Sequence, residues 1–316
     1  DQGLVRYDGN NFELFAHIPD DTTSIGPGDV RCISASPDGL IWVGTRLGGF
    51  NSFDPLTLKF KRYPYAGLET NGYGSIRSIN EDSEYVWIGG DSYNIHRFNK
   101  STEQYESFQP DWVVSNPEFE KCLISEILQD KLNPDLLWIT FLVFHPSYTE
   151  AKVSTLISFN KKTKQFIRCA CWGRPKYQEP DGKIWLVSKG LNRFDPKTGQ
   201  CDHFRLDFKM GQPGVEPWVR DFVFTGDRYL VSAPYAIAYF YPTGRYDSLQ
   251  YGRDLGTVDD IFIDGQKNVW FGRNTGISVL SAQEEQIRYY PLEKYGLKER
   301  IYPGRLAYDP GTNTVF

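Results

Sequence analysis

The stretch DVRCISASPDGLIWVGTRLGGFNSFDPLTLKFKRY, residues 29–63, contains the structural unit that the rest of the chain repeats. It predicts four short strands, VRCIS, IWVGT, FNSFD and KFKRY, which are rich in β-branched and aromatic residues. The breaks between them carry Gly, Pro and Asp, whose backbone preferences turn the chain tightly. The stretch therefore predicts an antiparallel four-stranded sheet, which cannot bury both of its faces alone.

The same unit recurs along the chain, and its second strand marks each copy. The markers are Trp42, Trp87, Trp138, Trp185, Leu230, Trp270 and Phe316. The intervals of 45, 51, 47, 45, 40 and 46 residues agree with the spacing of about 40–50 residues that is typical of propeller blades. Complete units lie near 29–63, 74–108, 120–168, 171–206, 218–250 and 256–291.

The two ends of the chain supply the halves of one more unit. Residues 301–316 provide a first strand and part of a second, and residues 1–15 provide a third and a fourth. A ring that is closed by strands from both ends leaves no sheet edge unpaired. We therefore predict an all-β, seven-bladed propeller of four-stranded antiparallel blades, with residues 1–316 as a single domain. The alternative is that both ends fall inside blades of a longer protein.

Composition narrows the function classes. The net charge is −5 and the pI is about 5.5, which argues against a nucleic-acid surface. No window approaches the roughly 18 apolar residues of a membrane span, so we expect no membrane contact by this chain itself. No signal peptide is present, although the chain begins inside a repeat, so a leader or anchor removed earlier is compatible with the sequence.

The cysteines show no metal-binding pattern. They stand at positions 32, 122, 169, 171 and 201, without CxxC or zinc spacing. Their odd number argues against a full disulfide framework, although it does not exclude an oxidising compartment. We expect buried free thiols, no metal and no cofactor.

Three segments show a resemblance to a known repeat: GLVRYDGNNFELF, DGLIWVGTRLGGFNSFDPLTLKF and DGKIWLVSKGLNRFDPKTGQ. They resemble the two-component regulator propeller repeat, whose pattern is roughly D-G-x-x-W-x-G-T-x-x-G-L-x-x-[FY]-D. The resemblance covers nearly the whole chain and is weakest at 120–168 and 218–250. The motif specifies the fold well and the ligand poorly, because the residues that make it recognisable are structural.

The resemblance implies the periplasmic sensor region of a hybrid two-component system, part of an inner-membrane receptor. In that class two propellers and a β-sandwich precede a membrane span and a histidine kinase, and the ligands are typically oligosaccharides. It therefore implies an oligosaccharide ligand that is bound and not turned over, and a further propeller, a β-sandwich and a kinase as partner domains. A homodimer is compatible with this class.

The start of each first strand is the position where residues of different blades can converge around the channel. Alignment of the repeats puts arginine there in four of the seven blades, as Arg31, Arg77, Arg174 and Arg220. Asp259 is in register in another blade, and Trp172 and Trp218 stand two residues before their arginines. Arginine binds carboxylate or sulfate groups bidentately, and tryptophan stacks on the apolar face of a pyranose. The arrangement predicts an acidic sugar as ligand, with Asp259 accepting from sugar hydroxyls.

The opposing interpretation is structural. In it the arginines pair with acidic side chains of neighbouring blades, and the two tryptophans pack between blades. A ring of like charges is costly unless something neutralises it, which keeps the binding interpretation open.

Two long connections lie on the same face as the arginines. Residues 141–152 form the one large insertion, and we expect a loop in which His145 and Tyr148 close over the ligand. Residues 109–120 form the other connection, with Trp112 as its anchor. For each aromatic residue the alternative is that it only pins its own loop.

Enzymatic activity is the remaining alternative. The sequence contains no HExxH, no nucleophile elbow and no phosphate-binding glycine loop. The repeat also resembles that of streptogramin lyases, but the alignment brings no matching His and Glu pair to the channel mouth. A glycosidase needs two facing carboxylates, whereas Asp259 and Asp260 are adjacent in one strand and point to opposite faces. We predict no catalytic residues. A propeller lyase or glycosidase acting on a glycan or lactone, or a protein-interaction scaffold, remains the alternative.

Overall fold

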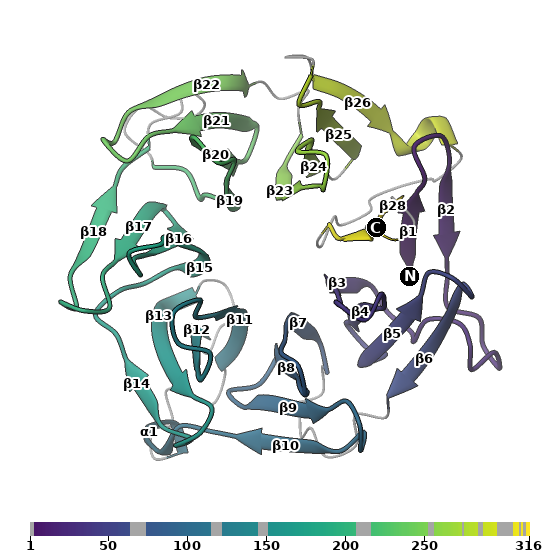
Figure 1. Cartoon of the computed structure of the whole chain (residues 1–316), viewed down its shortest axis with the longest axis horizontal. Helices are drawn as coiled ribbons and strands as arrows, with labels where there is room; N and C mark the ends of the chain where they lie inside the picture. The colour runs from purple at the N-terminus through teal and green to yellow at the C-terminus, as the bar shows by residue number, and fades with distance from the viewer. Residues whose placement is uncertain are drawn as a thin grey trace.

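The strands of the chain form seven four-stranded antiparallel sheets arranged in a ring (Figure 1). The computed structural model describes residues 3–63, 74–114, 122–144, 151–206, 216–251, 256–273, 275–283, 287–295, 306–309, 311 and 314–316. The ring confirms the predicted all-β, seven-bladed propeller.

Each blade runs from an inner first strand to an outer fourth strand. Blade 1 consists of β3 (Val30–Ala35), β4 (Ile41–Thr45), β5 (Phe50–Asp54) and β6 (Lys59–Tyr63). Blade 2 consists of β7 (Ile76–Glu81), β8 (Tyr85–Gly90), β9 (Ile95–Asn99) and β10 (Tyr105–Phe108). Blade 3 consists of β11 (Cys122–Gln129), β12 (Leu136–Phe144), β13 (Ala151–Asn160) and β14 (Phe166–Arg168). Blade 4 consists of β15 (Arg174–Gln178), β16 (Ile184–Ser188), β17 (Gly190–Phe194) and β18 (Cys201–Phe204). Blade 5 consists of β19 (Asp221–Phe224), β20 (Tyr229–Ala233), β21 (Ala236–Phe240) and β22 (Tyr246–Tyr251). Blade 6 consists of β23 (Val258–Ile263), β24 (Val269–Arg273), β25 (Gly276–Leu280) and β26 (Ile287–Pro291). Two short helices, α1 (Asp111–Val114) and the 3₁₀ helix η3 (Leu292–Tyr295), follow β10 and β26.

Blade 7 is built from both ends of the chain. It contains β27 (Tyr308–Asp309) and β28 (Thr314–Val315) from the C-terminal end and β1 (Leu4–Tyr7) and β2 (Phe12–Phe15) from the N-terminal end. Tyr7 in β1 pairs with Val315 in β28, and the two termini lie in the same blade (Figure 1). The ring is therefore closed by N- and C-terminal strands, as predicted.

The antiparallel order gives the ring two distinct faces. The first strands begin at one face, which also carries the loops between second and third strands and the connections between blades; we call it the upper face. The opposite, lower face carries the hairpins between first and second strands and the turns between third and fourth strands. This division decides which side chains of different blades can meet.

Aromatic pairs hold neighbouring blades together at six joints. In each, the marker residue of one blade meets the last aromatic residue of the third strand in the next blade. The pairs are Trp42–Phe98, Trp87–Phe159, Trp138–Phe194, Trp185–Phe240, Trp270–Tyr7 and Phe316–Phe53. Their ring centroids lie 5.4–6.2 Å apart at interplanar angles of 63–79°. Such edge-on pairs add about 0.5–1.5 kcal/mol each to the stability gained by burying their area.

Acidic residues in the lower-face hairpins satisfy four of the indole N–H groups. Trp87, Trp138, Trp185 and Trp270 donate to Asp82, Asp130, Glu179 and Asp264 over 2.8–3.0 Å. A buried indole needs such an acceptor. The acidic residue of each hairpin therefore orients the tryptophan that wedges the joint.

A buried ion-pair network links the inner strands of blades 3, 4 and 5. Lys176 Nζ in β15 lies 3.1 Å from Glu126 Oε2 in β11 and 3.0 Å from Asp221 Oδ1 in β19. The three side chains are 5–8% exposed. Asp221 also accepts from the backbone N–H of Ile261 in blade 6 over 2.8 Å, and Asp260 accepts from the N–H of Leu306 in blade 7. Carboxylates of one inner strand thus bind the backbone of the next.

A disulfide corrects the expectation of free thiols. Cys171 and Cys201 are bonded, whereas Cys32, Cys122 and Cys169 are thiols. The segment after β14 continues along β13, with Cys169 N–H donating to Leu156 O and Leu156 N–H donating to Cys171 O. This course brings Cys171 against the outer strand of blade 4. The bond therefore joins blade 3 to blade 4.

We expect loss of this bond to destabilise the fold. The two cysteines are 30 residues apart, and a bridge of that span typically contributes about 2–4 kcal/mol. Urea unfolding of Cys171→Ala/Cys201→Ala should show that loss against the wild type, whereas Cys169→Ala is the matched control with a thiol that forms no bridge. Equal midpoints for the double variant and the wild type would contradict the assignment.

The insertion at 141–152 differs from the expected loop. β12 and β13 extend into it, and their pairing continues to Phe144 opposite Ala151. Its apolar run FLVF favours a longer β-ribbon.

No helix among the described residues is long and apolar enough to cross a bilayer.

Candidate functional site

A β-bulge sets the position of the predicted arginines in blades 1 and 2. The extra residue of the bulge is Arg31 in blade 1 and Arg77 in blade 2, with Ser125 and Asp259 at the same place in blades 3 and 6. Bulges re-aim a side chain and are over-represented at barrel rims and next to active sites. Arg220 directly precedes β19, so it holds the corresponding position in blade 5. The sequence alignment of these positions agrees with the strand pairing.

Blade 4 departs from the alignment. There the bulge falls at Lys176, because the pairing skips this residue between Pro175 and Tyr177. Pro175 has no N–H to give to the ladder, so the irregularity moves next to it. Arg174 therefore pairs in register with Val187 and donates from Nη2 to the carbonyl oxygen of Arg220 over 2.6 Å. The prediction that Arg174 occupies the same position as the other arginines is wrong.

The four arginines form two separate groups. In blades 1 and 2, Arg77 Nε lies 2.5 Å from Asp91 Oδ1, and Arg31 Nη2 lies 3.8 Å from Asp29 Oδ2. Burial and the nearby Arg77 guanidinium lower the pKa of Arg31. These carboxylates belong to the same blade as their arginine. Arg77 is thus held by a close carboxylate, whereas the contact between Arg31 and Asp29 is loose.

The second group lies in blades 4 to 6, and we name it the Trp–Arg cluster: Trp172, Arg174, Trp218, Arg220 and Asp259. Arg220 Nε lies 3.7 Å from Asp259 Oδ1, a loose contact between half-exposed side chains. Burial raises the pKa of Asp259, and Arg220 and Arg174 oppose that rise. One carboxylate therefore faces two guanidinium groups.

Both tryptophans of the cluster are open to solvent. Trp172 is 47% exposed and Trp218 is 53% exposed, whereas Trp42, Trp87, Trp138 and Trp185 at the blade joints are buried. Lys189 Nζ lies 5.5 Å from the ring centroid of Trp218, and the backbones of these two residues form a bridge between blades 4 and 5. Trp218 thus contacts the neighbouring blade, but about half of each indole stays open to solvent, so inter-blade packing accounts for only part of these two side chains.

The sequence places His203 in a fourth strand as a partly exposed structural residue, but it does not predict that a glutamate pairs with it beside the cluster. His203 stacks on Trp172, with centroids 6.2 Å apart, and its Nε2 lies 3.1 Å from Glu216 Oε1. Its Nδ1 lies 2.8 Å from Asn192 Oδ1, and Asn192 donates to the carbonyl oxygen of Trp172. Glu216 stands in a connection between blades that has no repeat register, so the alignment could not pair it with a residue of β18. Together these contacts fix Trp172.

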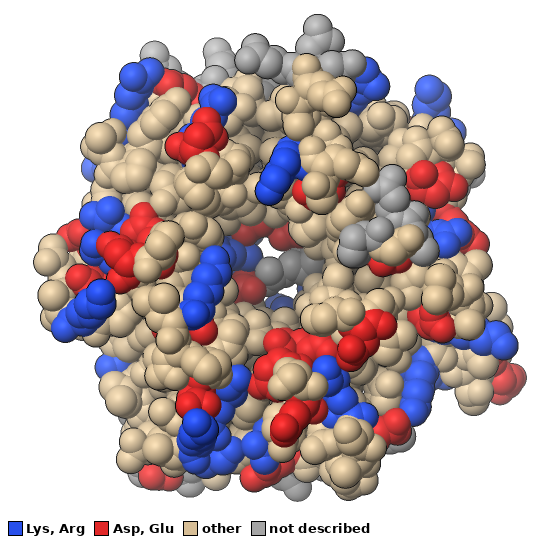
Figure 2. All heavy atoms as spheres, in the orientation of Figure 1, with Lys and Arg blue, Asp and Glu red and all other residues tan. Residues whose placement is uncertain are grey.

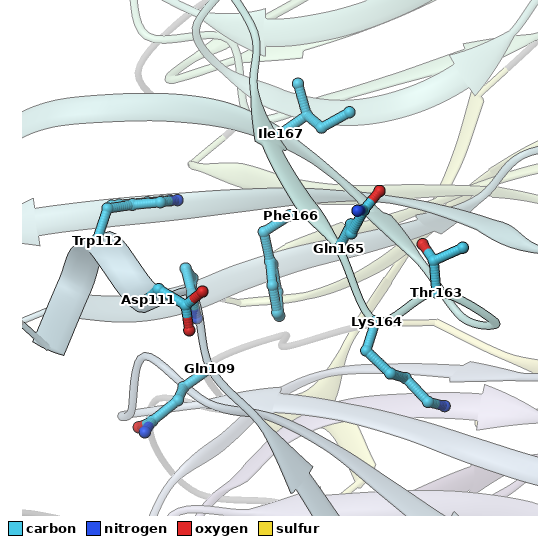
Figure 3. Close-up of a pocket in the computed structure, with 9 residues that line it drawn as sticks. Gln109, Asp111, Trp112, Thr163, Lys164, Gln165, Phe166 and Ile167 are labelled. Carbon is cyan, nitrogen blue, oxygen red and sulfur yellow. The ribbon is translucent and has the colours of Figure 1, made fainter.

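The proposed lid lies outside the described residues, since both His145 and Tyr148 are in the segment 145–150. Trp112 packs edge-on against Phe141 at 6.0 Å and lies under the Arg168 guanidinium. A pocket of about 510 Å³ lies at this place and is lined by residues 109–112 and 163–167. Figure 3 shows these side chains. Because Trp112 packs against two residues of blade 3, it anchors the connection that leads from blade 2 to that blade.

The carboxylates weighed for catalysis have structural partners. Asp260 is buried and accepts from Leu306, whereas its neighbour Asp259 is partly exposed beside Arg220, so the two point apart as predicted. Glu126 is buried against Lys176. In the part of the chain that the structure describes, no group of three His, Cys, Asp or Glu side chains gathers as a metal site.

Figure 2 shows a central hollow with acidic and basic side chains on its wall. With the Trp–Arg cluster on the upper face, the fold and the site define a seven-bladed propeller that presents solvent-exposed aromatic and cationic groups from adjacent blades.

Solved structures with the same fold include the class that the repeats resemble. The extracellular domains of the proposed hybrid two-component systems BT4673 and BT3049 from B. thetaiotaomicron each superpose with a TM-score of 0.69 at 16% identity, over 94% and 92% of this chain. The chain spans only 37% and 38% of those two proteins. Virginiamycin B lyase from Staphylococcus aureus is also similar, with a TM-score of 0.66 at 13% identity over 92% of this chain and 94% of the lyase. These likenesses confirm the propeller fold.

Comparisons at the level of sequence add no relative. No family model matches the chain, and no curated protein matches it.

Proposed function

We propose that the chain is an extracytoplasmic ligand-sensing propeller of a two-component receptor, which binds an acidic oligosaccharide at the Trp–Arg cluster without turning it over. The observation that carries the proposal is the pair of half-exposed tryptophans, Trp172 and Trp218, each two residues before an arginine on neighbouring blades. An exposed indole offers a flat apolar surface to a sugar ring, and a guanidinium binds a carboxylate or sulfate in a fork.

The setting of the domain has independent support. The Cys171–Cys201 bond is typical of an oxidising compartment, since cytosolic proteins rarely keep disulfides. Similar propellers occur in the extracellular domains of hybrid two-component systems, which are longer proteins. We propose a periplasmic location in an inner-membrane receptor, with a further propeller, a β-sandwich and a kinase as partner domains and with a homodimer as the signalling form.

Calorimetric titration with uronate- or sulfate-bearing oligosaccharides and with their uncharged counterparts tests the proposal. We expect saturable binding of the charged sugars only, with the sugar recovered intact. Trp218→Ala should weaken that binding about tenfold, because it removes a stacking surface. Tyr289→Ala is the matched control, since Tyr289 is a 43% exposed aromatic residue of the outer strand of blade 6. Equal binding of charged and uncharged sugars would contradict the role of the arginines.

Lyase chemistry is the second candidate, because His203 and Glu216 lie 3.1 Å apart next to Trp172. Loss of the sugar during the titration would favour it, provided that His203→Gln stops the loss.

A further inference from the structure

The joint between blades 5 and 6 breaks the rule that the other blades follow. Leu230 in β20 stands at the marker position, because it pairs with Val223 as Trp42 pairs with Ser34. Leu280 in β25 stands where the other blades have the last aromatic residue of the third strand, since it pairs with Val269. Two leucines therefore replace the edge-on aromatic pair of the other six joints.

A pocket opens at this joint on the lower face. Its volume is about 410 Å³, within the range of about 300–1,000 Å³ that small-molecule sites occupy. Leu230, Leu280, Val269 and Leu249 form its apolar floor. Leu230, Leu280 and Val269 are smaller than the aromatic residues of the other joints, so the pocket lies over them and offers an apolar floor to a planar ring.

The rim of the pocket carries positive charge. The Arg228 guanidinium lies 4.3 Å from the ring centroid of Tyr239, and both residues line the pocket. Asp227 is 3.2 Å from Arg228, but its side chain is 69% exposed, so the pair is weakly held. Lys267 lines the other side of the rim, from the hairpin between β23 and β24. Two cations and one exposed carboxylate, Asp227, thus stand around a pocket that has an apolar floor.

We propose that the pocket between blades 5 and 6 binds a small aromatic compound that bears an anionic group. Its ring takes the space of the missing aromatic pair, edge-on or offset against Tyr239, and its anion contacts Arg228 and Lys267. An uncharged ring would form no ion pair with the two cations. An aliphatic anion would cover less of the apolar floor than a ring does. The site is separate from the Trp–Arg cluster, because it lies on the opposite face, at the far ends of β19 and β23.

Methyl-resolved NMR titration with indole-3-acetate tests this inference, and tryptophol, which has the same ring and no charge, is the matched control. We expect saturable shifts of the Leu230, Leu249 and Val269 methyl groups, with affinity for tryptophol at least about tenfold lower because a charge-assisted hydrogen bond is lost. Arg228→Gln/Lys267→Gln should lower the affinity for indole-3-acetate to that for tryptophol.

Variants that place aromatic side chains in the joint test whether the ligand binds there. Leu230→Trp/Leu280→Phe restores the aromatic pair, so it should raise the thermal midpoint and abolish binding. Leu280→Phe alone serves if the double variant does not fold. Absence of shifts for both probes in the millimolar range, or full binding by a folded refilled variant, would overturn the proposal.

Discussion

Replacing both Arg174 and Arg220 by alanine is expected to lower the affinity for an acidic oligosaccharide by a factor of about 100 or more. Each guanidinium can form a charge-assisted hydrogen bond with the sugar anion, and each such bond is typically worth about a factor of ten in affinity or more. The loose contact of 3.7 Å between Arg220 and Asp259 leaves that guanidinium able to turn toward a ligand. Isothermal titration calorimetry of the double variant measures the effect.

The matched control is the other arginine group. Arg31→Ala/Arg77→Ala removes the same charge from blades 1 and 2, where neither arginine follows a tryptophan and Arg77 is held by Asp91 over 2.5 Å. We expect this control to retain binding. Loss of affinity in both double variants to the same extent would mean that the general positive field of the face, and not the Trp–Arg cluster, attracts the sugar.

Replacing Lys176 by methionine is expected to destabilise the fold by about 3–5 kcal/mol, because it leaves two buried carboxylates without their cation. Glu126 and Asp221 lie 3.1 and 3.0 Å from the Lys176 ammonium, and all three side chains are almost fully buried. Methionine keeps an unbranched chain that is one atom shorter, so the effect reports mainly the charge. Urea unfolding of the variant measures the loss.

Two further variants interpret that result. In Glu126→Gln/Lys176→Met/Asp221→Asn no charge remains, and the amide introduced at position 221 still offers an oxygen to the N–H of Ile261, so a large part of the stability should return. Lys183→Met removes a lysine from an exposed pair with Asp181 and should leave the urea midpoint nearly unchanged. An unchanged midpoint for Lys176→Met would show that the network contributes nothing net.

The fold was predictable because the repeat carries its own register. Each marker residue fixes where a second strand lies, and the pairing then places the first and third strands of the blade. The sequence also shows the exception at Leu230, where the tryptophan is missing. It does not show the pocket that results, because the pocket also depends on Leu280 in the next blade.

The candidate site was predictable only in part, for physical reasons. Pro175 shifts a bulge by two residues, and a linear alignment cannot show which residue the strand pairing skips. Cys171 and Cys201 meet because the chain after β14 continues along β13, a path that no spacing rule encodes. Glu216 comes from a connection of variable length. Long-range contacts between blades thus decided what the repeat left open.

A closed ring of blades shares any strain among its joints, and it yields first at the weakest. Six joints are wedged by aromatic rings, whereas the one between blades 5 and 6 relies on Leu230 and Leu280 beside a pocket. The joint between blades 5 and 6 is therefore the least stable contact between neighbouring blades. When the ring opens locally, blades 5 and 6 separate before the other blades. A molecule that binds between them then stabilises the closed ring.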